Sequence, residues 1–156
     1  MIALDANGAD GGPGLVADGA RLSGEHVLLF GPAGQMDGAG CEVVDAPERI
    51  GGDEEPVRAV RSKPTASIVQ AAGAVAEGRA EALVSAGSTG PTLAAATLSI
   101  KRMKGVHRPA LAALVPVPGR PVLLLDAGAN VQVRPEHLVQ FAYMGAAFME
   151  LSLIHI

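Results

Sequence analysis

The chain has 156 residues, of which 49% are hydrophobic and only 3% aromatic, with no Trp, one Cys and a formal net charge of −4. This length predicts one domain, the acidic balance argues against a nucleic-acid partner, and a single cysteine excludes an internal disulfide and a cysteine-rich metal site. No apolar run approaches the roughly 18 residues of a membrane span and the N-terminus lacks a signal peptide's basic start, so we expect a cytoplasmic protein.

Apolar runs alternate with helical patterns along the whole chain. Strands are predicted over residues 2–4, 27–30, 41–44, 82–84, 111–115 and 122–125. Helices are predicted over residues 13–24, 68–78 and 92–100 and from residue 135 onward, because apolar side chains recur there at helical spacing. The polar segment 45–64 is expected to carry the chain away from the sheet. This alternation predicts an α/β fold, a three-layer, doubly wound and mainly parallel sheet.

Three of the predicted strands end in a small or acidic residue followed by glycine. The turns are Asp5-Ala6-Asn7-Gly8-Ala9-Asp10, Ser85-Ala86-Gly87-Ser88-Thr89-Gly90 and Asp126-Ala127-Gly128-Ala129-Asn130. In an open parallel sheet, ligands bind outside the carboxyl ends of the strands, and glycine lets backbone N–H groups approach an anion. We therefore predict that Asp5, Ser85 and Asp126 converge on one small, anionic ligand.

These turns, in their order, resemble motifs of the bacterial phosphate acyltransferase family PlsX (acyl-ACP:phosphate acyltransferase). Residues 5–10 are similar to its DAMGGD opening, residues 53–61 to its DEPVRAVR segment and residues 85–90 to its SAGNTG turn, and residues 108–112 and 123–145 continue the match. Asn7, Ala9 and Ser88 depart from the family pattern, which predicts modest tuning of the pocket. The resemblance covers residues 1–150 and the family's N-terminal half, whereas residues 151–156 do not resemble it and are interpreted as a truncation or frame artefact.

The resemblance implies an isocitrate/isopropylmalate dehydrogenase-like fold and an enzyme of phospholipid synthesis. It would transfer a fatty acyl group from acyl carrier protein to inorganic phosphate, giving acyl phosphate. Because phosphate itself attacks the thioester, the site needs an anion cradle and donors for the thioester oxygen instead of a protein nucleophile. No cofactor and no metal are expected. The full-length protein is expected to be a homodimer that contacts the membrane peripherally through its other half.

Candidate site residues follow from the turns and from the resemblance. Catalytic roles are assigned to Asp5, Asn7, Asp126 and Asn130. Phosphate binding is assigned to Gly8, Ser85, Gly87, Ser88, Thr89, Gly90, Arg58 and Arg61. Carrier docking is assigned to Lys101, Arg102, Lys104 and Arg108, with Arg58, Arg61 and Lys63 as a second basic patch. The competing interpretations are loop caps for the turn residues, a solvated helix face for the arginines and a helix C-terminus stabilised by cations for residues 101–108. His137 is expected to be a surface or cap residue.

Two other interpretations remain open. The first is a phosphotransacetylase-like or nucleotide- or coenzyme A-binding enzyme on the same kind of sheet. Against it, no G-x-G-x-x-G follows the first strand in the required form, and no G-x-x-x-x-G-K-[ST] is present. The second is a non-catalytic fragment that folds poorly because half of the sheet and the subunit partner are missing.

Overall fold

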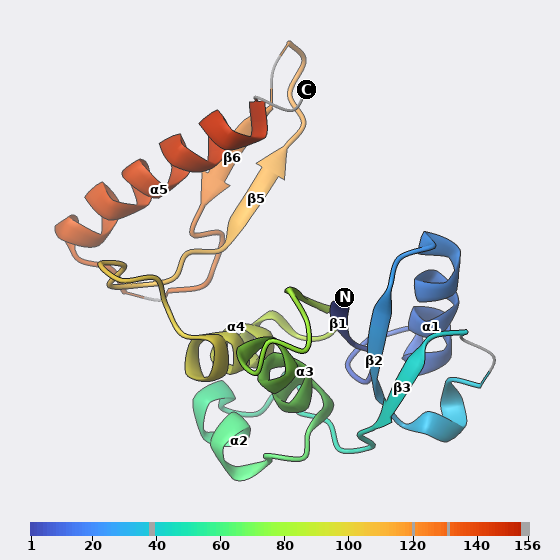
Figure 1. Ribbon diagram of the computed structural model, residues 1–156. Helices are drawn as coiled ribbons and strands as arrows, with labels where there is room; N and C mark the ends of the chain where they lie inside the picture. The colour runs from blue at the N-terminus through green and yellow to red at the C-terminus, as the bar shows by residue number, and fades with distance from the viewer. Residues whose placement is uncertain (38–39, 120, 131, 154–156) are drawn as a thin grey trace. The chain divides into compact units, whose positions relative to one another are not determined.

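A computed structural model describes residues 1–37, 40–119, 121–130 and 132–153, with side chains described as far as Leu151. The chain divides into two compact units, Met1–Lys101 and Arg102–Ile156. Figure 1 shows the elements of both units in chain order.

The first unit is built on a four-stranded parallel sheet. Its strands are β1 (Ile2–Asp5), β2 (Val27–Gly31), β3 (Glu42–Asp45) and β4 (Ala82–Ser85), in the order β3-β2-β1-β4. All five residues of β2 are buried, as expected for a strand inside a parallel sheet. The chain steps outward from β1 to β3 and then crosses back to place β4 on the other side of β1. The strand order therefore reverses between β1 and β4.

Helices cover both faces of this sheet (Figure 1). Because side chains alternate along a strand, one face of the sheet presents Leu4, Val27 and Leu29 to α1 (Gly12–Ser23), through Ala17 and Ala20. The other face presents Ala3, Leu28 and Phe30 to α3 (Ser67–Ala76), through Ala71 and Ala74. Alanine at the contact lets each helix backbone come close to the sheet. The α/β class with a parallel sheet flanked by helices is thus confirmed.

The buried face of α1 is formed by small side chains. Ala17 and Ala20 are buried, whereas Leu15 and Leu22, which share the apolar spacing of this helix, are 64% and 75% exposed. A helix that contacts the sheet through alanines leaves its larger side chains at the margin, and apolar spacing alone does not distinguish the two arrangements.

Two helices differ from the prediction: one forms within a segment for which no helix was predicted, and one begins earlier than predicted. Within the polar segment 45–64 the chain forms α2 (Pro56–Ser62), where Pro56 takes the first helical position. The Glu55 carboxylate accepts hydrogen bonds from the backbone N–H groups of Val57 (3.2 Å) and Arg58 (2.6 Å). The helix predicted from residue 92 begins three residues sooner, as α4 (Thr89–Ala95), and passes directly into the π-helical turn η2 (Ala96–Ile100). A short 3-10 turn, η1 (Ala33–Gln35), follows β2.

The second unit is a β-hairpin with one long helix. The strands β5 (Ala112–Val115) and β6 (Val122–Leu125) pair antiparallel in a sheet of their own, and α5 (Pro135–Leu153) contacts β6. The short connection between these strands permits a hairpin but no parallel crossover, so the described parallel sheet has four strands. Helix α5 continues through Leu153, past residue 150 where the family motifs end, and residues 154–156 lie outside the described residues.

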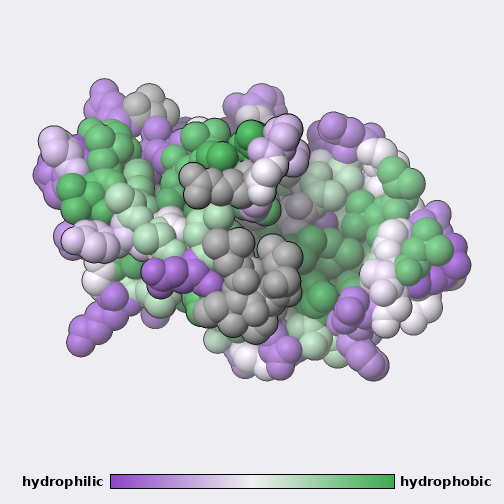
Figure 2. All heavy atoms as spheres, turned by 90° about the horizontal axis from the view of Figure 1, so that it is seen from above, coloured by the Kyte–Doolittle hydropathy of each residue, from purple (hydrophilic) through white to green (hydrophobic). Residues whose placement is uncertain are grey.

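The core of the second unit is formed by α5 and the inner face of the hairpin. Phe141 is 5% exposed and lines, with Leu123 and Leu125, an open groove of about 480 Å³ between α5 and β6. Phe148, further along the same helix, is 47% exposed. On the outer face of the hairpin, Val115, Val122 and Leu124 are open to solvent. Figure 2 shows hydrophobic residues among hydrophilic ones on the face that it presents.

Candidate anion-binding site

The carboxyl ends of β1 and β4 lie side by side where the strand order reverses. Asp5 and Ser85 are register partners, and the Ser85 hydroxyl donates a hydrogen bond of 2.8 Å to Asp5 Oδ2. Asp5 is only 3% exposed. In doubly wound folds, ligands bind at such a reversal of strand order, so the structure brings two of the predicted site residues together at the expected place.

The loop after β1 is tied to the segment that follows β3. The Asn7 backbone N–H donates to Asp5 Oδ1 at 3.3 Å, and its side-chain nitrogen donates to the carbonyls of Ala46 (3.3 Å) and Pro47 (2.9 Å). The Asn7 amide therefore holds two loops together, which is a positioning role.

Gly8 and Gly87 bring the first two glycine turns into backbone contact. A Cβ on Gly8 would lie 2.7 Å from Gly87 Cα, and a Cβ on Gly87 would lie 3.1 Å from Gly8 Cα. The Gly87 N–H donates to Ser85 Oγ at 3.0 Å. Because this N–H is already bonded, it is not available to an anion held by the turn.

The segment that precedes α2 packs on the turn 85–90. A Cβ on Gly52 would lie 2.8 Å from Ser88 Oγ, and one on Gly90 would lie 2.9 Å from Pro56 Cγ. Ser88 is the N-cap of α4 without a side-chain cap bond, and its carbonyl accepts from Thr92 Oγ1 at 3.0 Å. The motif that contains Pro56 is thereby placed against the glycine turn.

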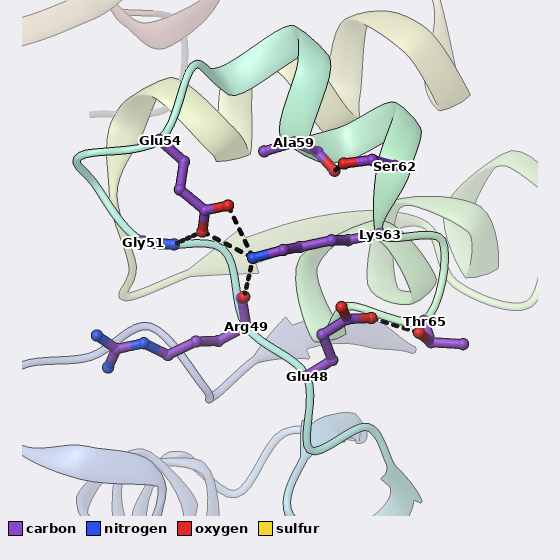
Figure 3. A network of polar contacts seen from close by, with 8 residues as sticks. All are labelled: Glu48, Arg49, Gly51, Glu54, Ala59, Ser62, Lys63 and Thr65. Atoms are coloured by element: carbon purple, nitrogen blue, oxygen red, sulfur yellow. Dashed lines mark hydrogen bonds and ion pairs between the residues drawn. The ribbon is translucent and has the colours of Figure 1, made fainter.

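A polar network fixes the loop of residues 48–54 (Figure 3). Lys63 Nζ lies 2.7 Å from Glu54 Oε2 and donates to the Arg49 carbonyl at 3.3 Å, while the Gly51 N–H donates to Glu54 Oε1 at 2.7 Å. The hydrogen bond from Lys63, aided by that from Gly51, lowers the pKa of the Glu54 carboxyl below its ordinary value. Lys63 is thus a bracing residue of this loop, and its ammonium group is not the free docking charge that the second basic patch assumed.

Loop 48–54 closes a small cavity over the sheet edge. The cavity measures about 10 Å³, and its wall includes Asp5, Gly8, Arg49, Ser67, Gly87 and Ser88. This volume suits a group of the size of one water molecule. Ser67 and Arg49 were not singled out from the sequence, because their only signals are a place near a predicted helix start and a place in a polar loop. Arg58 and Arg61 lie exposed on α2 and do not line the cavity.

A second polar cluster follows β6. Asn130 Nδ2 donates to Asp126 Oδ1 (3.1 Å) and to the Pro109 carbonyl (2.9 Å), and Arg108 Nη1 donates to Asn130 Oδ1 at 3.2 Å. Asp126 has a φ of 62°, in the left-handed region that Asp tolerates better than most residues. The structure brings Asp126, Asn130 and Arg108 together. The convergence of Asp126 with Asp5 and Ser85 stays a prediction.

The proposed docking residues differ in their surroundings. Lys101, Arg102, Lys104 and Arg108 are all exposed. Arg102 Nη1 donates to the His107 carbonyl and Arg108 is hydrogen-bonded to Asn130, whereas Lys104 forms no ion pair with the described residues.

His137 lies at the start of α5. Its Nδ1 accepts a hydrogen bond from the Arg134 N–H at 3.1 Å, so it caps this helix, in agreement with the prediction.

The described part of the chain forms neither a cluster of metal ligands nor a membrane-spanning helix. No group of three or more His, Cys, Asp and Glu side chains there is arranged to hold a metal ion. No helix there is long and apolar enough to span a bilayer.

A parallel sheet whose strand order reverses at a glycine-rich edge defines an α/β protein of the class that binds a small ligand beyond its strand ends. The sequence matches, over residues 1–156, the protein family described as "Fatty acid synthesis protein". The chain belongs to this family, as its motifs predicted. It is 45% identical to the phosphate acyltransferase of Desulforamulus reducens over 97% of this chain and 49% of that protein. Identity is 40% with the phosphate acyltransferase of Clostridium acetobutylicum, over 98% and 50% of the two chains, and 41% with that of Listeria monocytogenes, over 96% and 48%. The chain therefore spans about half the length of the curated relatives it matches.

Proposed function

We propose that this chain is part of an enzyme that transfers a fatty acyl group from acyl carrier protein to inorganic phosphate. One observation supports the proposal. A single cavity at the reversal of strand order is enclosed by three segments that are far apart in sequence: the loop after β1, loop 48–54 and the turn 85–90. Phosphate acyltransferase is the name of the relatives that match nearly the whole chain.

The proposed reaction assigns simple roles to the residues. A phosphate oxygen attacks the thioester carbonyl carbon, the carbon–sulfur bond breaks, and the carrier thiol leaves with a proton, so no covalent enzyme intermediate is needed. Asp5 orients Ser85, and Ser85 in turn holds the Gly87 N–H, which fixes the shape of the turn. Ser88, Thr89 and Gly90 then offer the remaining donors to the phosphate. Asp126 and Asn130 are proposed to join the site in the full-length protein.

The same proposal includes the fold type, the oligomeric state, the location and the docking surface of the full-length protein. In the full-length protein the sheet is proposed to be a three-layer, doubly wound sheet of the isocitrate/isopropylmalate dehydrogenase type. The protein is proposed to be a cytoplasmic homodimer that contacts the membrane peripherally. Lys101, Arg102, Lys104 and Arg108 are proposed to dock the acidic carrier protein.

The test is a chimeric enzyme in which this chain replaces the matching half of the Desulforamulus reducens phosphate acyltransferase. We expect phosphate-dependent formation of acyl phosphate from acyl carrier protein thioester.

Thr89→Ala in this chimera removes a hydrogen-bond donor to the anion. Because a charge-assisted hydrogen bond is worth about 1.5–3 kcal/mol, the phosphate KM should rise about tenfold or more. The KM for the carrier substrate, measured in the same assay, should change little. An unchanged phosphate KM would place the phosphate elsewhere.

A further inference from the structure

Ser67 is a buried donor without a protein partner. It is 2% exposed, begins the ten-residue helix α3, and its hydroxyl forms no hydrogen bond with the described residues. Among those residues, no fully enclosed side-chain nitrogen or oxygen atom lacks a partner. The Ser67 hydroxyl must therefore keep its small exposure toward the cavity that Ser67 lines. Ala66, the N-cap of α3, offers no side-chain cap, the Ser67 N–H donates to the Glu48 carbonyl at 3.0 Å, and Ser67 and Ile68 of the first helical turn line the cavity.

Asp5 is a buried acceptor in the wall of the same cavity. Its carboxylate accepts hydrogen bonds from the Ser85 hydroxyl and the Asn7 N–H. An ionised carboxylate has about four acceptor sites, so acceptor capacity remains. No ion pair among the described residues neutralises Asp5, and Arg49, in the wall of the same cavity, supplies a positive charge for the anion. A carboxylate at an anion site repels a fully deprotonated oxygen but accepts a hydrogen bond from a protonated one.

We propose that this cavity receives a protonated oxygen of inorganic phosphate, with the Ser67 hydroxyl donating to that oxygen and Asp5 accepting its P–OH hydrogen. The inference rests on the proposed function, in which phosphate is the acceptor substrate. The cavity volume of about 10 Å³ holds one such oxygen, and the other three oxygens remain outside it, toward Ser88 and Thr89. The arrangement selects for a proton on the anion. Sulfate has the shape of phosphate but carries no proton at neutral pH, so Asp5 disfavours it.

The experiment measures anion binding to the 156-residue chain by isothermal titration calorimetry at neutral pH, with inorganic phosphate and with sulfate as probes. We expect the wild-type chain to bind phosphate at least about tenfold more tightly than sulfate, because sulfate leaves a buried carboxylate facing an unprotonated oxygen. Asp5→Asn offers sulfate a donor and should reduce this ratio to about threefold or less. Ser67→Ala should weaken phosphate binding by about threefold to tenfold. Ser62→Ala, on the exposed side of α2, is the matched control and should change neither affinity.

Equal affinities of the wild-type chain for the two anions, or no saturable phosphate binding, would overturn the inference. So would an Asp5→Asn chain that keeps both its fold, by circular dichroism, and the wild-type ratio. If Asp5→Asn does not fold, two measurements still test the inference. They are the ratio of phosphate to sulfate affinity in the wild-type chain and the phosphate affinity of Ser67→Ala. The proposed function fails separately: discrimination between the anions without acyl phosphate formation by the chimera contradicts only the acyl transfer, and acyl transfer without discrimination contradicts only the role of Asp5 and Ser67.

Discussion

Asp5 shows why a single residue needs its surroundings before its role can be stated. The sequence marks it as an acidic residue at a strand end, a position typical of loop caps and of catalytic carboxylates. In the structure it is buried, accepts from Ser85 and Asn7, and lines the cavity. Its burial, without an ion pair to the described residues, and its free acceptor capacity toward the cavity favour a protonated ligand oxygen, and these properties come from contacts that no local pattern contains.

Gly8 offers a residue-scale test of how tightly the two turns fit. Gly8→Ala would place a Cβ 2.7 Å from Gly87 Cα. Since the neighbour is backbone and cannot swing aside, we expect the free energy of unfolding to fall by about 1–3 kcal/mol. Chemical denaturation of the chain measures this change.

Gly19→Ala is the matched control for Gly8→Ala. A Cβ there meets nothing within 4 Å, and Gly19 lies inside α1, where alanine is favoured over glycine by about 0.5–1 kcal/mol. The control should therefore be as stable as the wild type or more so. If Gly8→Ala behaved like Gly19→Ala, the close approach of the two turns would be wrong.

At the scale of elements, the loop between β3 and α2 decides the shape of the site. Its bracing pair, Glu54 and Lys63, is nine residues apart in sequence and brackets the whole of α2 (Pro56–Ser62). Gly52, in the middle of the loop, touches Ser88. The loop is therefore a wall of the cavity, and the pair that holds it acts on the site from a distance.

The Glu54–Lys63 pair predicts a dependence of stability on acid. The pKa of Glu54 is lowered on folding, chiefly by the hydrogen bond from Lys63. The pair therefore stabilises the folded chain above the ordinary carboxyl pKa of 4.5, and this contribution disappears as the pH falls through the lower, folded value. We expect Glu54→Gln to lower the unfolding temperature at about pH 7, and we expect this difference from the wild type to shrink as the pH falls below 4.5.

The control for Glu54→Gln is Glu77→Gln. Glu77 pairs with Arg79 at 2.9 Å, but both side chains are more than half exposed, and such pairs contribute little. Its unfolding temperature should follow that of the wild type across the whole pH range. A constant difference between Glu54→Gln and the wild type at every pH would mean that the pair contributes through packing instead of charge.

For the whole molecule, charge bears on how an acidic partner would bind. The chain carries a net charge of −4, so an acidic carrier protein must approach a local basic surface. Of the four proposed docking residues, Lys104 is exposed and forms no hydrogen bond or ion pair with the described residues, whereas Arg102 and Arg108 are bonded to their neighbours. Lys104 therefore tests docking with the least disturbance of structure.

We expect Lys104→Glu in the chimeric enzyme to slow association with acyl carrier protein and to weaken the salt dependence of its KM, because rim charges act mainly on encounter. Activity with a small acyl thioester should be unchanged. Arg21→Glu, on α1, changes the net charge equally and should leave the carrier KM near that of the wild type. Parallel loss of activity with carrier and small thioester would assign Lys104 a structural role.

The sequence by itself determined the class of fold, the family and most strand positions. Hydrophobic runs that end in Asp5 and Ser85 identify strands locally, because burial in a parallel sheet requires continuous apolar residues. The order of the motifs along the chain identified the family, because each motif is constrained by its own turn geometry. The helix that begins at Glu55 and Pro56 has a local signal, an acidic cap followed by proline, but its polar surroundings give no apolar periodicity that would predict a helix.

Only the tertiary structure decided which residues meet. The contact of Gly8 with Gly87, the burial of Ser67 beside Asp5 and the brace between Glu54 and Lys63 all join positions that are separated in the chain. The same holds for the alanine face of α1 and for the hairpin of β5 and β6, where a short connection excluded a parallel crossover. Local patterns specify the conformation of a segment, whereas distances between segments depend on how closely small side chains allow them to pack. For that reason the cavity, and the chemistry proposed for it, follow from the fold.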